Sequence, residues 1–240
     1  MIYFICVIGE NQLDRVENLR TSLTKYNASL LILPFYNYEK KNLSKIKVIG
    51  EFLCNNVWKK TDLFCLLDAF DVLCVENPIP RIETFFEETQ ADLYFSMEQN
   101  FGAHFEPSKC FFQTIMQKKY GKDDFFINSG VIIGKFECLY ETFSKMLREW
   151  DDLCATIQCT SDQVFWTYFL WKHPYLVGKY CFEFDVHSTL TYTVGFKESV
   201  ENYREKGSVF CHVWALSTEE QYEKYRWLCE DHFCKAVLKS

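Results

Sequence analysis

The chain has 240 residues, of which 48% are hydrophobic and 18% aromatic, so it can build a large core and is not a disordered chain. The formal net charge is −7 and there is no long basic block, which argues against nucleic acid as a partner. An acidic protein of this kind can still bind an anionic donor if a metal ion and a local lysine neutralise the donor's charge. We expect a single domain over residues 1–240.

The twelve cysteines are scattered through apolar surroundings, and none forms a C-x-x-C pair. This pattern favours reduced, buried thiols and a reducing compartment. The first apolar run, residues 2–8, lacks a basic flank and a cleavage pattern, so we interpret it as a core strand and not as a signal peptide. No run reaches the roughly 18 apolar residues of a membrane span. The sequence thus predicts a cytoplasmic protein without a membrane partner.

The first seventy residues alternate between strand and helix patterns. Strands are predicted at residues 2–8 and 29–35, helices at 13–25 and 44–56 (with Ser44 as cap), and a third strand ends at Asp68. Such alternation predicts a parallel sheet with right-handed crossovers, and ligands bind such sheets beyond the carboxyl ends of the strands. No G-x-G-x-x-G follows the first strand, which disfavours a dinucleotide-binding Rossmann domain.

Two acids follow the third strand, Asp68 at its end and Asp71 three residues later. Carboxylates at that edge can hold one hard divalent cation, which can in turn bridge a diphosphate. A D-x-x-D after an apolar run can equally be a turn or a helix cap, and the motif alone does not decide between the two.

The middle of the chain predicts a helix at 81–89, a strand at 91–97 that stops at Glu98, a helix at 108–120, and a strand-like run at 125–134. A polar triplet, Asn128–Ser129–Gly130, interrupts that run. Gly130 lets another group approach the backbone closely, and Asn128 offers an amide for hydroxyl recognition. The alternative is a β-bulge with a self-satisfied Asn.

The last third predicts helices at 137–150 and 161–171, a strand at 182–184, an apolar run at 209–211 that stops at His212, and a helix at 218–239. Ser161 or Asp162 could be only an N-cap, and a lone His at a strand end is often structural. The last helix carries many aromatic residues, which could pack on the sheet or on a second copy, so a homodimer is left open.

Several short sequence blocks of the chain, taken in their order and spacing, resemble the glycosyltransferase domain of the collagen lysyl hydroxylases and related collagen-type glycosyltransferases. The resemblance spans nearly the whole chain and rests on residues 45–48, 67–73, 95–98, 126–134, 161–165 and His212. It implies a GT-A-like α/β fold with a mostly parallel central sheet flanked by helices. It also implies a UDP-sugar donor, a collagen-like polypeptide acceptor and Mn²⁺.

The resemblance assigns roles to individual residues. Asp68, Asp71 and His212 would bind the metal, and an imidazole beside two carboxylates suits Mn²⁺ better than Mg²⁺. Lys45, Phe70, Asp68 and Trp214 would contact the donor, with Phe70 stacking near the uracil. Asp162, Glu98 and Asn128 would form the catalytic sugar pocket, with Asp185 ranked below them.

The activity that the resemblance implies is retaining transfer of glucose from UDP-glucose to galactosyl-hydroxylysine, or hydroxylysine, of collagen-like chains. A two-step route needs a carboxylate nucleophile, for which Asp162 is the first candidate and Glu98 the second, whereas a front-face route needs neither. The alternatives are a UDP-galactose-dependent hydroxylysine galactosyltransferase and a catalytically silent collagen-binding module. The silent module gains support from Val213–Trp214–Ala215, where the family has Gly-Asn-Gly. A viral or microbial collagen-like substrate would suit a stand-alone cytoplasmic enzyme.

Overall fold

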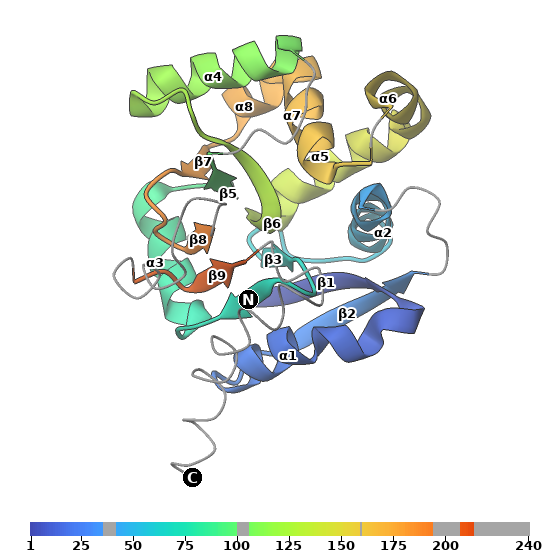
Figure 1. Cartoon of the computed structure of the whole chain (residues 1–240), viewed down its shortest axis with the longest axis vertical. Coiled ribbons are helices and arrows are strands. Elements are labelled where there is room, and N and C mark those ends of the chain that lie inside the picture. Colours follow the sequence, from blue (N-terminus) through green and yellow to red (C-terminus); the bar gives the residue numbers. More distant parts are fainter. Residues whose placement is uncertain (36–41, 100–105, 159, 194–206, 214–240) are drawn as a thin grey trace.

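The computed structural model describes residues 1–35, 42–99, 106–158, 160–193 and 207–213 (Figure 1). Its centre is a six-stranded sheet of order β2-β1-β3-β6-β5-β7. Strand β6 runs antiparallel to both of its neighbours, and the other neighbouring pairs are parallel. The six strands are β1 (Ile2–Gly9), β2 (Leu30–Phe35), β3 (Leu63–Leu67), β5 (Leu93–Glu98), β6 (Phe126–Lys135) and β7 (Phe182–Asp185).

A second, three-stranded sheet has the order β4-β9-β8 and consists of β4 (Val72–Cys74), β8 (Thr191–Thr193) and β9 (Phe210–His212). Strand β4 begins directly after Asp71 and pairs antiparallel with β9, in a register that sets Val72 opposite His212. This small sheet therefore brings a residue from near the end of the described chain back to the acids that follow β3.

Helices cover both faces of the central sheet (Figure 1). The helical segments are η1 (Glu10–Val16, a 3₁₀ helix), α1 (Glu17–Thr24), α2 (Leu43–Cys54), α3 (Pro78–Thr89), α4 (Glu106–Tyr120), α5 (Phe136–Arg148), α6 (Trp150–Ile157), α7 (Asp162–Lys172) and α8 (Pro174–Lys179). Successive residues of β1 and β3 point to opposite faces, so Ile5 and Phe64 pack in the core beneath α2, α5 and α7, while Phe4 and Cys65 pack in the core beneath α1 and α3. None of the described helices has both the length and the apolar character that a bilayer span requires.

This architecture confirms the predicted α/β class with a mostly parallel central sheet, and it differs from the sequence in detail. The helix predicted from residue 13 is a 3₁₀ segment broken at Gln12, which has a non-helical φ of −129°, and α-helix begins only at Glu17. Helix α3 begins at Pro78, ahead of the predicted residue 81, because the Asn77 side chain accepts a hydrogen bond from the Ile79 N–H. Ser44 is not a cap, since α2 already begins at Leu43. The helix predicted at 218–239 lies outside the described residues.

Candidate metal centre

The three predicted metal ligands lie together at the carboxyl end of β3. Asp68, Asp71 and His212 each offer a ligand atom, and these atoms lie within 4.8 Å of one another. Backbone hydrogen bonds fix the segments that carry them. The Asp68 N–H donates to the Gly130 carbonyl at 2.8 Å, and the Val213 N–H donates to the Asp71 carbonyl at 2.8 Å. The fold therefore presets the positions of all three side chains.

His212 is the most informative member of this cluster. Its side chain is 3% exposed, and neither ring nitrogen has a hydrogen-bond partner among the residues that the structure describes. Nε2 lies 3.4 Å from Oδ2 of Asp71. Burial lowers the pKa of His212, but the carboxylates of Asp71, Asp68 and Glu98 outweigh it and raise the pKa above its ordinary value. A buried imidazole without hydrogen bonds, facing two carboxylates, has the donor set that a divalent transition metal requires.

Gly130 of β6 lies directly against this imidazole. A Cβ atom built on Gly130 would be 2.4 Å from Cε1 and 2.6 Å from Nδ1 of His212. The backbone of Gly130 is not in the left-handed region, so its conformation does not by itself demand glycine. The predicted close approach to Gly130 is thus confirmed, and the group that approaches is the ring of His212.

Lys45, in the first turn of α2, joins the metal cluster to Asp162. Its Nζ lies 2.5 Å from Oδ1 of Asp68 and 2.5 Å from Oδ2 of Asp162, and it donates to the Ser129 carbonyl at 3.4 Å. Burial opposes the charged ammonium, but the two carboxylates outweigh burial and raise the pKa of Lys45. One ammonium thus bridges a predicted metal ligand and the predicted nucleophile.

Negative charge is in excess at this site. Around Lys45 and His212 the described structure places four carboxylates, those of Asp68, Asp71, Glu98 and Asp162. Burial raises the pKa of Asp68, with Asp71 and Asp162 adding to the effect and Lys45 and His212 opposing it. A divalent cation would relieve this repulsion, so the residues present fit a metal ion in charge as well as in ligand type.

The predicted pocket residues Glu98 and Asn128 form one hydrogen-bonded unit. Oε1 of Glu98 accepts hydrogen bonds from Nδ2 of Asn128 at 3.1 Å and from the side-chain amide of Gln163. Oδ1 of Asn128 accepts from the Gly130 N–H at 2.8 Å. Burial raises the pKa of Glu98, although its hydrogen bonds and His212 oppose the shift. Asn128 therefore has the self-satisfied bulge geometry that was the alternative to hydroxyl recognition.

Helix α7 begins where the Ser161–Asp162–Gln163 block predicts. Ser161 is the N-cap and accepts a hydrogen bond from the Val164 N–H at 3.4 Å. Asp162 is the first helical residue and turns its carboxylate toward Lys45. The sequence did not single out Gln163 or the hydroxyl of Ser96, although both lie inside the blocks that carried the family resemblance.

Phe70 and Trp214 are the two aromatic residues predicted to bind the donor, and the described part of the chain does not show a free donor contact at either. The ring of Phe70, between the two acids, already has the guanidinium of Arg15 stacked 4.0 Å from its centroid. Sequence reasoning did not identify Arg15, because it comes from η1 and meets Phe70 only in the fold. Trp214 lies outside the described residues.

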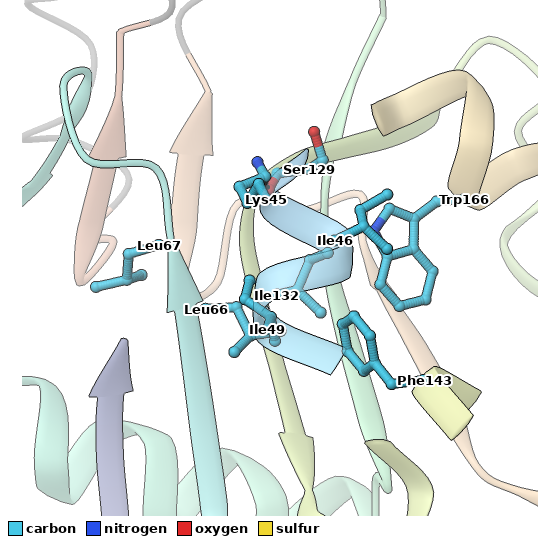
Figure 2. Close-up of a pocket in the computed structure, with 9 residues that line it drawn as sticks. All are labelled: Lys45, Ile46, Ile49, Leu66, Leu67, Ser129, Ile132, Phe143 and Trp166. Atoms are coloured by element: carbon cyan, nitrogen blue, oxygen red, sulfur yellow. Dashed lines mark hydrogen bonds between the residues drawn. The ribbon is translucent and has the colours of Figure 1, made fainter. Parts of the chain in front are cut away.

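A small cavity lies beneath Lys45, between α2 and the sheet (Figure 2). Figure 2 shows Lys45 and Ser129 at one end, while apolar side chains such as Ile46, Phe143 and Trp166 line the rest. It has room for one water molecule at most. A sugar nucleotide does not fit there, so the cavity belongs to the packing under Lys45.

No protein-family model and no curated protein sequence matches the chain. Solved structures do match. A glycosyltransferase involved in the glycosylation of the major capsid of PBCV-1 aligns with a TM-score of 0.56 and 14% identity, over 92% of this chain and 99% of that one. The galactosyltransferase LgtC, solved with donor and acceptor sugar analogs, aligns with a TM-score of 0.52 and 11% identity, over 97% and 96% of the two chains. The chain therefore has the GT-A glycosyltransferase fold. At such low identity the likeness establishes the fold and not the substrate.

Proposed function

We propose that the chain is a metal-dependent glycosyltransferase that moves a hexosyl unit from a UDP-sugar to a hydroxyl group. The observation that carries this proposal is His212, a buried imidazole whose ring nitrogens have no hydrogen-bond partner in the described structure and which offers a ligand atom within 4.8 Å of those of Asp68 and Asp71. The cluster lies at the strand ends of a GT-A sheet, the edge at which α/β folds bind ligands.

Asp68, Asp71 and His212 would hold the metal, and their mixed nitrogen and oxygen set favours Mn²⁺ over Mg²⁺. Such an ion supplies positive charge to a departing diphosphate. Lys45 adds a second positive charge to the same edge, where it can contact the diphosphate. Arg15, stacked on Phe70, adds a third beside the acids.

For a retaining reaction by two displacements, Asp162 is the first candidate nucleophile, because its buried carboxylate contacts the same ammonium as Asp68. Glu98, held by Asn128 and Gln163, is the second candidate. A front-face reaction requires neither. We expect Asp162→Asn to lose most of kcat while metal and donor affinity persist. A variant that kept most of its activity would exclude the nucleophile role.

The acceptor that we propose is galactosyl-hydroxylysine, or hydroxylysine, in a collagen-like chain, with glucose as the donated sugar. Its support is the ordered set of blocks that resembles the collagen-type enzymes, including Lys45, Glu98 and the Asp162–Gln163 pair, which the fold gathers around one edge. The sequence Val213–Trp214–Ala215 after His212, where the collagen-type enzymes have Gly-Asn-Gly, is the observation that favours a silent collagen-binding module instead. The presence of all three candidate ligands argues against that module, because a binding module has no need of a buried imidazole without hydrogen bonds beside two carboxylates.

A UDP-release assay tests the proposal. The full chain is incubated with UDP-glucose or UDP-galactose, with Mn²⁺ or a chelator, and with or without a galactosyl-hydroxylysine peptide. We expect release that needs Mn²⁺, rises with the peptide and is faster with UDP-glucose. Release with UDP-galactose and a hydroxylysine peptide would replace the sugar assignment only. No release under any pairing would overturn the enzymatic proposal.

A further inference from the structure

Strand β6 contains a three-residue bulge beside the metal cluster. In its antiparallel pairing with β5, Phe95 lies opposite Ile132, but the next residue, Ser96, lies opposite Asn128. Residues 129, 130 and 131 therefore have no counterpart on β5. On its other side β6 pairs with β3 only as far as Leu67 opposite Val131, so the bulge projects at the end of β3.

Two side chains close this bulge. The hydroxyl of Ser96, fully buried, donates to the Asn128 carbonyl at 2.9 Å and accepts from the Val131 N–H at 3.3 Å. The side-chain oxygen of Asn128 accepts from the Gly130 N–H at 2.8 Å. Backbone groups that the sheet ladder leaves unpaired are thus satisfied locally, which holds the bulge in one conformation.

The closed bulge contacts three members of the site through its backbone. The Gly130 carbonyl accepts from the Asp68 N–H, the Ser129 carbonyl accepts from Lys45, and Gly130 supplies the bare backbone against which the His212 ring lies. The ring is 3% exposed and is therefore enclosed by its neighbours, with Nε2 3.4 Å from Oδ2 of Asp71. A group that pushed the ring away from Gly130 would thus change its position relative to Asp71.

We propose that this bulge, closed by Ser96 and Asn128, is the positioning element of the metal centre, and that Gly130 determines whether the His212 ring can take its ligating place. The inference rests on the proposed metal site. It assigns Asn128 to positioning through Gly130, and it adds Ser96 and Gly130 to the residues on which metal affinity depends.

Gly130→Ala is the direct test. Alanine tolerates the Gly130 backbone, so the added Cβ conflicts with the imidazole and not with φ. We expect Mn²⁺ affinity, measured on the full chain by calorimetry and by electron paramagnetic resonance of the free ion, to fall about 10- to 100-fold, as for other groups that orient metal ligands. Unchanged affinity in the variant, with metal binding by the unmodified protein established, would overturn the inference. Absence of Mn²⁺ binding by the unmodified protein would instead overturn the proposed metal site.

Gly134→Ala is a matched control in the same strand. Its Cβ would be 2.7 Å from Cδ1 of Leu93 and 2.8 Å from Cγ of Leu139, which is also a steric conflict but involves only the apolar core. We expect this control to lower the urea midpoint of unfolding and to leave Mn²⁺ affinity unchanged. An equal loss of affinity in both glycine variants would show a general packing effect and contradict the proposal.

Two further variants test separately the contact with the His212 ring and the closure of the bulge. Adding His212→Ala to Gly130→Ala removes the atoms that the new Cβ meets, so Gly130→Ala should lower the urea midpoint less in that background than alone. Equal effects in the two backgrounds would contradict the contact between the added Cβ and the His212 ring.

Ser96→Ala removes a hydrogen bond that closes the bulge without adding an atom, and it remains informative if Gly130→Ala does not fold. It should weaken Mn²⁺ binding several-fold, and full affinity would rule out the role of Ser96.

Discussion

Asp185 and Asp71 are both acids at the boundary of a strand, yet their surroundings differ completely. Asp185 accepts hydrogen bonds from the backbone N–H groups of Thr189 at 2.6 Å, Leu190 at 2.9 Å and Thr191 at 3.0 Å, and from the hydroxyl of Tyr94 at 2.6 Å. Four donors fill the acceptor sites of one carboxylate. Asp71 instead faces an imidazole and a second carboxylate.

The comparison separates a structural carboxylate from a ligand site. A buried polar group with all of its hydrogen bonds made gains nothing from a ligand, whereas a buried group left without partners has a cost that a ligand can remove. Asp185 belongs to the first kind and holds the turn between β7 and β8, which gives it a structural role in place of the pocket role considered from the sequence. The imidazole of His212, beside Asp71, belongs to the second kind, because neither of its ring nitrogens has a hydrogen-bond partner in the described structure.

The largest expected effect is that of Asp71→Ala. It removes one of the three proposed metal ligands, so Mn²⁺ affinity and Mn²⁺-dependent donor affinity should fall by more than the ~100-fold upper range for orienting groups. The unfolding free energy should change by less than about 1 kcal/mol, because relief from the Asp68 charge offsets the lost attraction to His212. Calorimetric titration and urea unfolding measure the two quantities. Unchanged donor affinity would show that the cluster is not the metal site.

Asp185→Ala should give the opposite result. Four donors would lose their acceptor in a buried turn, so the unfolding free energy should fall by about 3 kcal/mol. Mn²⁺ affinity of the folded protein should stay unchanged. A variant with normal urea unfolding and weakened Mn²⁺ binding would place Asp185 in the site and remove the distinction between the two acids.

Tyr94→Phe tests the same structural unit with one atom removed. Burial, with the carboxylate of Asp185, raises the pKa of Tyr94 well above its ordinary value, so the hydroxyl stays protonated and donates. Without it, Asp185 keeps its three backbone donors, and the unfolding free energy should fall by about 1.5 kcal/mol. The effects of Tyr94→Phe and Asp185→Ala should not add in the double variant, because both remove the same bond. Additive losses in urea unfolding would contradict this network.

Sequence patterns predicted the edge of the sheet where the site lies, for a clear physical reason. The run at 63–67 is apolar at every position, as a strand buried on both faces must be, and its end at Asp68 therefore marks the end of the sheet. The same argument predicted that the strand near residue 210 would end at His212. Both predictions depend only on where a run of apolar residues stops.

For the local geometry of the site, the polar triplet indicated a bulge as one alternative and a close approach at Gly130, but not the contacts that close the bulge. Strand β6 is also buried along nearly its whole length, and a run buried on both faces looks the same whether it lies parallel or antiparallel to its neighbours. The bulge depends on Ser96 meeting Asn128 across 32 positions of sequence, and the stack of Arg15 on Phe70 depends on η1 packing against the segment that follows β3. Contacts of this kind exist only once the register of the sheet is fixed.

A third carboxylate, that of Glu149, extends the comparison of Asp185 with Asp71 and gives the prediction with the smallest expected effect. Glu149, between α5 and α6, lies 3.0 Å from Nζ of Lys145, 2.9 Å from Nζ of Lys172 and 3.0 Å from Nε2 of His173. Burial opposes its ionisation, but hydrogen bonds from Lys172, Lys145 and His173 outweigh burial and lower the pKa of Glu149 to about 2. Unlike Asp71, this acid has its charge fully compensated by protein groups.

Because the pKa of Glu149 is lower in the folded protein than its ordinary value of 4.5, its contribution to stability is complete above about pH 4.5 and is lost as the pH falls toward 2. After allowance for solvent screening, that contribution should be about 1 kcal/mol or less. Glu149→Gln should therefore be less stable than the unmodified protein at pH 6, and the difference in urea-unfolding free energy should shrink steadily toward pH 3. A difference that did not change with pH would show that the cations around Glu149 do not hold its charge. Asp71 would then differ from Glu149 in burial alone, and not in how its charge is compensated.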